Sequence, residues 1–257
     1  MEFDLFLFAG QSNMAGRGIT SPQWPEGAPA LEPGAGYEYR AISDPDRLHE
    51  AKEPFGINEN NPAGIFEPGK KTGSMVTAFI NAYFRETGIP VIGVSASKGG
   101  SAMAQWQGNG DYLSDALMRL GRAESYFAAH AMAPRRRYML WCQGETDGDL
   151  GTDPETYKAG FKHMLSQMKA HGIERCFLVA IGEYNGQKGF DYSGIRRAQL
   201  ELAEELPDVE LVCDDFHTMR ARGLMKDDFH YYQQAYNEVG IAAGRAAGEI
   251  DRQGMGR

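Results

Sequence analysis

The same four residues, Asp-Asp-Phe-His, occur twice near the carboxyl end of the chain, at 214–217 and at 227–230. In each copy a carboxylate stands three residues before a histidine. It can therefore hold one imidazole nitrogen and leave the other free to take a proton. His217 directly follows an apolar, strand-like run, and its alternative interpretation is a polar residue that closes a strand. His230 lies where a loop meets a helical pattern, which favours Asp227 and His230 as the working pair.

A general base of this kind requires a nucleophile. Ser12 lies in the turn Gly10-Gln11-Ser12-Asn13-Met14-Ala15-Gly16, directly after an apolar run. The flanking glycines allow a sharp turn that exposes the hydroxyl and leaves the Ser12 N–H free to donate. The pattern predicts Ser12 as the nucleophile of an ester hydrolase, the alternative being a serine that only caps a helix.

Ester hydrolysis also needs donors aimed at the developing oxyanion. Another apolar run ends in Ser97-Lys98-Gly99-Gly100-Ser101, where no side chain keeps the backbone from a close approach. The sequence alone does not separate Gly99 from Gly100 as the donor. A third run ends at Gln143, whose side-chain NH₂ can donate. We therefore expect an oxyanion hole formed by Ser12, Gly99 and Gln143.

Other polar and aromatic residues lie close to these strand ends. Gln11 and Asn13 flank the nucleophile, and either bonds the wall of the site or the substrate, or belongs only to the turn. Glu145 follows Gln143 and is expected to brace the nucleophile turn, with substrate binding or replacement of Asp227 as alternatives. Trp106 offers a ring that would stack on a sugar or pack in the core. Two further residues have a structural as well as a functional interpretation. Asp147 is a loop or capping carboxylate or contacts the substrate, and Lys98 is a solvated lysine or a partner for an anionic sugar.

The elements that must position these residues alternate between two patterns. Nearly continuous apolar runs predict buried strands, and segments of 3.6-residue periodicity predict helices between them. Alternation of this kind predicts an α/β fold with a parallel sheet whose carboxyl edge holds the site. The predicted strands are 3–9, 90–96, 137–142, 175–181 and 209–213, and the predicted helices are 74–86, 112–130, 154–171, 192–205 and about 231–251.

The stretch from about 16 to 71 fits neither pattern and is rich in Pro, Gly and Asn. It is too long to be an ordinary connection in a compact domain. We expect a long loop insertion over the carboxyl edge of the sheet, forming one wall of the site, within one domain that spans residues 1–257.

Composition narrows the possible partners. The net charge of −9 argues against a nucleic-acid backbone or an anionic membrane surface. The six histidines and three cysteines lack the spacing of a metal site, and no phosphate-binding loop is present, so no metal or cofactor is expected. The amino terminus resembles neither a leader nor a membrane span, which predicts a cytoplasmic protein, or a secreted one if a leader precedes this sequence. Oligomeric state is left open.

The motifs FAGQSNMAG, KGGS, WCQGETD and the late DxxH occur in this order from Phe8 to about Gly240. In combination they resemble the SGNH/GDSL hydrolase superfamily, in particular its carbohydrate acetylesterase branch of sialate O-acetylesterases and acetylxylan esterases. The resemblance implies a three-layer αβα sandwich with a five-stranded, flavodoxin-like parallel sheet and no cofactor.

The resemblance also implies roles for individual residues. Ser12 matches the family's nucleophile, Gly99 the glycine of its second block, and Gln143 the position of an oxyanion donor. Asp227 and His230 match its terminal DxxH. The implied activity is hydrolysis of acetyl esters on sugars through acetyl-Ser12. Two alternatives are a lipase or thioesterase on the same scaffold, and an inactive carbohydrate-binding protein.

Overall fold

A computed structural model describes residues 2–18, 27–108 and 110–254. The described residues form one sheet whose strands lie in the order β3-β2-β4-β1-β5-β6-β7. Its five longer strands are mutually parallel, as the sequence predicts. They are β1 (Asp4–Gly10), β4 (Val91–Ser97), β5 (Arg136–Cys142), β6 (Arg175–Val179) and β7 (Val209–Cys213).

The strand count of five is wrong, because the inserted stretch extends the sheet by two short strands. β2 (Gly36–Tyr39) pairs parallel to β4, and β3 (Leu48–Glu50) pairs antiparallel to β2. Four- and three-residue strands are too short to show a clear alternation of apolar and polar residues. The segment is thus not a loop throughout, although residues 53–73 between β3 and the next helix remain irregular.

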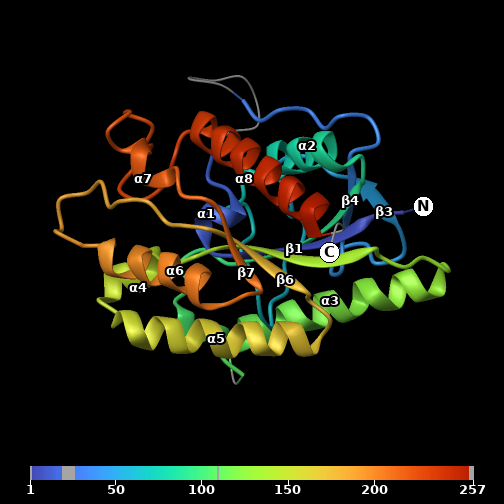
Figure 1. Ribbon diagram of the computed structural model, residues 1–257, viewed down its shortest axis with the longest axis horizontal. Helices are drawn as coiled ribbons and strands as arrows, with labels where there is room; N and C mark the ends of the chain where they lie inside the picture. Colours follow the sequence, from blue (N-terminus) through green and yellow to red (C-terminus); the bar gives the residue numbers. More distant parts are fainter. Residues whose placement is uncertain (1, 19–26, 109, 255–257) are drawn as a thin grey trace.

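Helices cover both faces of the sheet (Figure 1). α2 (Val76–Thr87) and α8 (Gln233–Gly254) lie together on one face, and α3 (Asp111–Ala129), α5 (Pro154–Ala170) and α6 (Ser193–Glu205) lie on the other. This is the predicted three-layer αβα sandwich. Short helices stand near the ends of strands: α1 (Ser12–Ala15), η1 (Met103–Trp106), α4 (Glu145–Leu150) and α7 (Phe216–Met219).

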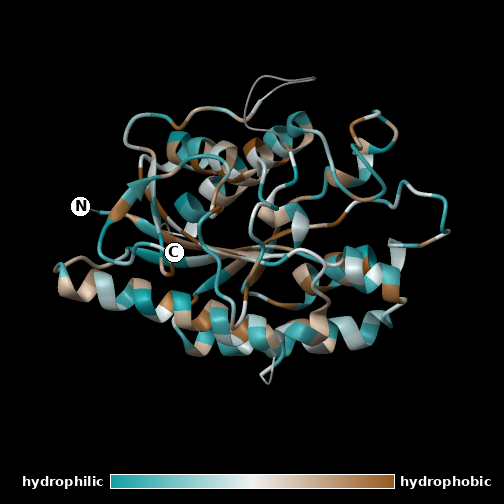
Figure 2. Ribbon diagram, turned by 180° about the vertical axis from the view of Figure 1, so that it is seen from behind, coloured by the Kyte–Doolittle hydropathy of each residue, from teal (hydrophilic) through white to brown (hydrophobic). Residues whose placement is uncertain are grey.

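The central strand β1 supplies both cores because its side chains alternate. Leu5 and Leu7 enter the core under α3, α5 and α6, whereas Phe6 and Phe8 enter the core under α2 and α8. Figure 2 shows the hydrophobic strands between helices whose outer surfaces are hydrophilic. A strand covered on both faces reads as a continuous apolar run, which is why β1 could be predicted.

The long helices begin and end within two or three residues of their predicted bounds, at recognisable signals. Asp153 caps α5 by accepting a hydrogen bond from Thr156 N–H at 3.0 Å, and Pro154 occupies the first helical position. Gly88 ends α2 in the left-handed region at φ +70°. Local chemistry of this kind is readable from the sequence without knowledge of the fold.

Candidate functional site

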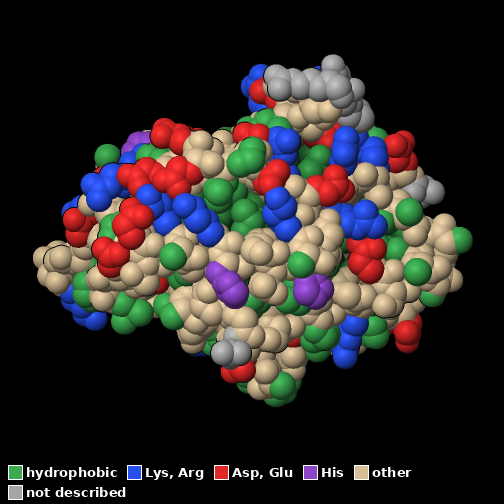
Figure 3. All heavy atoms as spheres, turned by 60° about the horizontal axis from the view of Figure 1, so that its bottom comes forward, with side chains coloured by type: hydrophobic (Ala, Val, Ile, Leu, Met, Phe, Trp, Pro, Cys, Tyr) green, Lys and Arg blue, Asp and Glu red, His purple; other side chains and the backbone are tan. Residues whose placement is uncertain are grey.

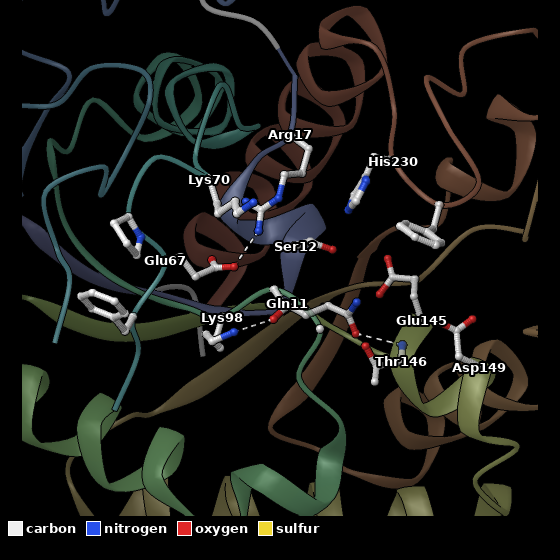
Figure 4. A pocket seen from close by; sticks show the side chains of 15 residues that line it. Gln11, Ser12, Arg17, Glu67, Lys70, Lys98, Glu145, Thr146, Asp149 and His230 are labelled. Atoms are coloured by element: carbon white, nitrogen blue, oxygen red, sulfur yellow. Dashed lines mark hydrogen bonds and ion pairs between the residues drawn. The ribbon is translucent and has the colours of Figure 1, made fainter. Parts of the chain in front are cut away.

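Ser12 opens the short helix α1 directly after the central strand β1. Gly10 adopts φ +139°, and a methyl group there would lie 2.0 Å from the Cys142 carbonyl oxygen, so only glycine fits this turn. Gln11 N–H donates to the same carbonyl at 2.9 Å. The turn brings the Ser12 side chain to a cavity of about 440 Å³ at the carboxyl edge of the sheet (Figure 4).

His230 lines the same cavity, although it is 218 residues away in the chain. Its Nδ1 lies 2.9 Å from Asp227 Oδ2, and Asp227 Oδ1 accepts from the His230 and Phe229 N–H groups at 2.8 and 3.0 Å. Because an ionised carboxylate can only accept, Nδ1 carries a proton. Nε2 is buried with no partner among the described residues. Figure 4 shows the imidazole pointing toward the Ser12 hydroxyl.

The electrostatics of this pair favour a charged Asp227. Partial burial acts to raise the pKa of Asp227, but the hydrogen bonds from His230 and Phe229 outweigh it and bring that pKa down to about 2. The carboxylate is therefore ionised at any pH near neutral. It is available to hold the imidazole in one orientation and to stabilise it once it has taken a proton.

The first DDFH copy lies elsewhere. His217 Nδ1 bonds the backbone carbonyl of Asp214, and the Asp214 carboxylate is held by Arg196. His217 lines a second cavity and does not line the one that contains Ser12. The structure thus brings together Ser12, Asp227 and His230 and keeps His217 apart.

Gln11 and Asn13 fasten the nucleophile turn to its surroundings. Gln11 Oε1 accepts from the N–H groups of Gly144 and Thr146 at 3.1 and 3.2 Å. Asn13 Nδ2 donates to Glu145 Oε1 and, at 3.1 Å, to the Phe229 carbonyl. Both side chains are buried and serve the turn. Gln11 also lines the cavity, whereas Asn13 does not.

Glu145 lines the cavity near His230. Burial raises the pKa of its carboxyl, opposed by the hydrogen bond from Asn13 and by the charge of His230. Its Oε1 accepts from Asn13, whereas Oε2 is buried without a partner among the described residues. The expected bracing role therefore has a physical basis, and one oxygen remains to face a substrate.

Gly99 and Gly100 differ in their surroundings. A methyl group at Gly99 would lie 2.3 Å from Arg17 Nη2 and 3.3 Å from Ser12 Cβ, so this backbone touches the nucleophile only because it lacks a side chain. Gly100 has φ +68° and faces open space. Within the described residues, neither Ser12 N–H nor Gly99 N–H donates a hydrogen bond. These two amides are available as oxyanion donors.

The structure does not bring Gln143 to the cavity. Its buried NH₂ donates to the Ser101 carbonyl at 2.9 Å and to Asp147 Oδ2 at 2.5 Å, and it does not line the space around Ser12. Both amide hydrogens are used, so none remains for an oxyanion in this arrangement. The competing acceptor is Asp147, four residues along the chain, which also accepts from Met103 N–H at 2.8 Å. Asp147 thus holds the loop together, which agrees with its interpretation as a structural carboxylate.

Trp106 is not a stacking platform. It is fully buried, donates to Ser101 Oγ at 3.0 Å and packs edge-on against Trp141 with ring centroids 5.0 Å apart. Two phenylalanines line the cavity: Phe229, next to His230, and Phe66, which is 45% exposed. Phe66 belongs to the inserted stretch, which supplies one wall of the site.

Several lining residues escaped the sequence analysis: Arg17, Phe66, Glu67, Pro68, Lys70, Thr146 and Asp149. Arg17 pairs with Glu67 at 2.7 Å, and Lys98 donates to the Gly99 carbonyl at 2.8 Å while lying over the Tyr112 ring. The lining therefore mixes both signs of charge. Because most of these residues lie in irregular segments, no periodicity indicates that they face the cavity.

Two searches of the described part of the chain were negative. No group of three or more His, Cys, Asp or Glu side chains is arranged to hold a metal ion. No described helix is long and apolar enough to cross a membrane.

Comparison with known proteins places this geometry in a family. The family model described as carbohydrate esterase, sialic acid-specific acetylesterase matches residues 2–248. A probable carbohydrate esterase of Arabidopsis thaliana is 28% identical over 260 residues, which cover 94% of this chain and 89% of that protein.

Solved structures show the same fold. An Arabidopsis thaliana protein superimposes with a TM-score of 0.68 at 23% identity, covering 95% of this chain and 96% of that one. A carbohydrate acetylesterase from Xanthomonas citri superimposes with a TM-score of 0.56 at 17% identity, covering 95% of this chain and 55% of that one. The resemblance read from the motifs is confirmed. The chain is an esterase and belongs to the family of carbohydrate esterases described as sialic acid-specific acetylesterases.

Proposed function

We propose that this esterase hydrolyses acetyl esters on sugars through Ser12, with His230 as the base and Asp227 as the acid that orients it. The observation that carries the proposal is the meeting of Ser12 and His230 in one cavity, with Nδ1 held by Asp227 and Nε2 left free. This is the arrangement that acyl transfer by a serine requires.

The reaction proceeds in two halves. His230 Nε2 takes the Ser12 proton as Oγ attacks the acetyl carbonyl, and the resulting oxyanion accepts hydrogen bonds from the Ser12 and Gly99 amides. The C–O bond to the sugar breaks, and the sugar oxygen receives the proton from His230. Water then attacks acetyl-Ser12 and loses a proton to His230. The bond to Ser12 Oγ breaks, Oγ takes the proton back from His230, and acetate leaves.

Supporting residues keep this geometry. Gln11 and Asn13 tie the nucleophile turn to residues 144–146, and Asn13 also reaches the loop that carries His230. Tyr236 of α8 donates to Asn13 Oδ1 at 2.6 Å and fixes its amide. The unpartnered Oε2 of Glu145 is placed to accept a hydrogen bond from a sugar hydroxyl.

The cavity suits an acetylated carbohydrate better than a long acyl ester. Its lining mixes charged and polar side chains with the rings of Phe66 and Phe229, whereas a lipid chain requires a continuous apolar surface. Phe66 supplies a face against which a pyranose can pack. Lipase or thioesterase activity on this scaffold predicts that octanoyl esters are cleaved faster than acetyl esters, and a binding protein predicts sugar binding without acetate release.

Replacing Ser12 by alanine tests the proposal. We expect the Ser12→Ala protein to fold, as judged by circular dichroism, and its turnover of p-nitrophenyl acetate to fall to near background. Acetate release from acetylated sialic acids, xylo-oligosaccharides and simple acetylated sugars then identifies the sugar. Wild-type activity that survives in the Ser12→Ala variant would exclude the mechanism.

A further inference from the structure

A second cavity, of about 280 Å³, lies beside the catalytic one. It is formed by the loop between β6 and α6, by the start of α6 and by α7, which carries His217. Figure 1 shows this loop and α7 at the same edge of the sheet as α1 and α4. The two copies of DDFH thus contribute a histidine each to neighbouring cavities.

The two cavities share a wall. Tyr192, which lines the second cavity, donates its hydroxyl to Asp149 of the first at 2.7 Å. Tyr184, also in the second cavity, donates to Asp228 at 3.3 Å, next to the Phe229 of the first. A molecule larger than one sugar that placed an ester at Ser12 would extend along this edge toward the second cavity.

The loop of the second cavity also holds the loop of the catalytic acid. Asn185 N–H donates to the Asp228 carbonyl at 2.8 Å, and Asn185 Nδ2 donates to the Asp227 carbonyl at 3.3 Å. The second cavity is therefore built onto the segment that positions His230. The Asn185 hydrogen bonds thus connect the wall of the second cavity to the loop that carries His230.

The lining has the chemistry of a site for a neutral sugar. The ring of Phe190 is partly exposed and packs against Tyr184 with centroids 5.0 Å apart, and Lys188 Nζ lies 5.9 Å from its centroid. The rest of the ring lines the cavity as an apolar surface. His217 Nδ1 bonds a carbonyl oxygen and must donate, so in the neutral imidazole Nε2 is an acceptor. Arg220 adds donors close to this ring.

The charges around the second cavity are balanced. Arg196 is held by Asp214 through its Nε at 2.8 Å, and Arg220 Nη1 lies 3.7 Å from Glu183. Asp191 adds a further carboxylate. Because both arginines in the lining have an acidic partner, the lining has no excess positive charge with which to select an anion.

We propose that the second cavity binds a neutral sugar unit of the same carbohydrate whose acetylated unit is bound at Ser12. The inference rests on the proposed function and makes the enzyme selective for oligosaccharides over single sugars. Phe190 packs against the ring of this unit, and His217 and Arg220 hydrogen-bond its hydroxyls. The first DDFH copy then serves substrate binding and the second serves proton transfer.

The test compares short and long substrates in matched variants. The probes are acetylated methyl xyloside against acetylated xylotriose, and 9-O-acetylated N-acetylneuraminic acid against its sialyllactose conjugate. We expect the wild type to have a higher kcat/KM for the longer member of the series it cleaves. Phe190→Ala and Arg220→Ala should each lose about two- to tenfold of that preference, through KM, as expected for one aromatic or hydrogen-bonding contact.

Controls separate this inference from the proposed function. Hydrolysis of p-nitrophenyl acetate should be unchanged in Phe190→Ala and Arg220→Ala, and Arg197→Ala, on the exposed side of α6, should keep the preference. Equal kcat/KM for short and long substrates, or a preference that survives both variants, overturns the second-cavity proposal alone. Cleavage of p-nitrophenyl acetate without acetate release from any sugar overturns both proposals.

Discussion

Asp227 and Glu145 are the two carboxylates that lie near His230. Only Asp227 reaches the ring, with Oδ2 at 2.9 Å from Nδ1, while Glu145 Oε1 is occupied by Asn13. A carboxylate that holds Nδ1 fixes the tautomer in which Nε2 can take a proton. At the scale of single residues, this contact supports the proposal that Asp227 is the acid and that Glu145 braces the nucleophile turn.

Replacing Asp227 by asparagine should therefore impair turnover more than binding. We expect kcat to fall by about 10²–10⁴ with KM little changed, because the amide no longer enforces the tautomer or stabilises the protonated ring. Steady-state kinetics with p-nitrophenyl acetate measures this. Asp215→Asn, at an exposed position of the first DDFH copy, is the matched control and should retain activity. A larger loss in Glu145→Gln than in Asp227→Asn would transfer the acid role to Glu145.

The same carboxylate predicts a pH dependence of stability. Folding lowers the pKa of Asp227 from 3.8 to about 2, so in this range the unfolded chain binds the proton more readily than the folded one. The contribution of Asp227 to the free energy of unfolding is complete above pH 3.8 and is lost as the pH falls through about 2. Urea unfolding from neutral pH to about pH 2.5 should show wild type and Asp227→Asn converging in acid. A constant difference between them would contradict the shift.

The sequence could indicate those candidate site residues whose partners are local. Asp227 and His230 interact across three positions, and Ser12 lies in a glycine-flanked turn, so their pattern is visible in a short window. The donor role expected of Gln143 is not met because Ser101 and Asp147 accept from its amide. The sequence could not choose between stacking and core packing for Trp106, because its partner Ser101 appears in the sequence as a loop residue. Phe66 faces the cavity only through the path of the inserted stretch, which no periodic signal predicts.

At the scale of elements, α8 positions the site by packing tightly on α2. Gly240, Gly244 and Gly248 are spaced by four residues and face the α2 segment, and a methyl group at Gly244 would lie 2.3 Å from the Phe79 carbonyl oxygen. The helices approach so closely because these positions lack side chains. α8 begins three residues after His230 and carries Tyr236, which fixes Asn13.

Gly244→Ala should therefore destabilise the fold although alanine has the higher helix propensity. Overpacking against backbone predicts a loss of about 1–3 kcal/mol in the free energy of unfolding. Gly121→Ala is the control, since Gly121 lies in α3 with no atom within 4 Å of the added methyl group, and it should gain about 0.5–1 kcal/mol. Urea denaturation measures both. If Gly244→Ala instead raised the free energy of unfolding, the close packing of α8 on α2 would not contribute to stability in this way.

The long elements were predictable and the inserted stretch was not, for one physical reason. Helix and strand periodicities report which faces are buried, whereas β2, β3 and the segment after them are held by distant polar contacts. Fully buried Arg119 of α3 donates to the carbonyls of Glu59 and Ser95, 60 and 24 residues away. Contacts of this kind leave no local pattern in the sequence.

At the scale of the whole molecule, the sheet order makes the site. β1 lies between β4 and β5, so the turns that carry Ser12, Gly99 and residues 143–147 meet at the point where the connections leave in opposite directions. The loop between α7 and α8 adds His230 at this edge. On the face seen in Figure 3, acidic and basic side chains are intermixed.

The central claim is that Ser12 is the nucleophile and that His230, near the other end of the chain, is the base that activates it. Labelling with a fluorophosphonate, followed by peptide mapping, tests it without knowledge of the sugar. We predict stoichiometric modification of Ser12 in the wild type and a rate of labelling at least about 10²-fold lower in folded His230→Ala, because the hydroxyl then lacks its base. Modification of another residue, or an equal rate at Ser12 without the imidazole, would contradict the account.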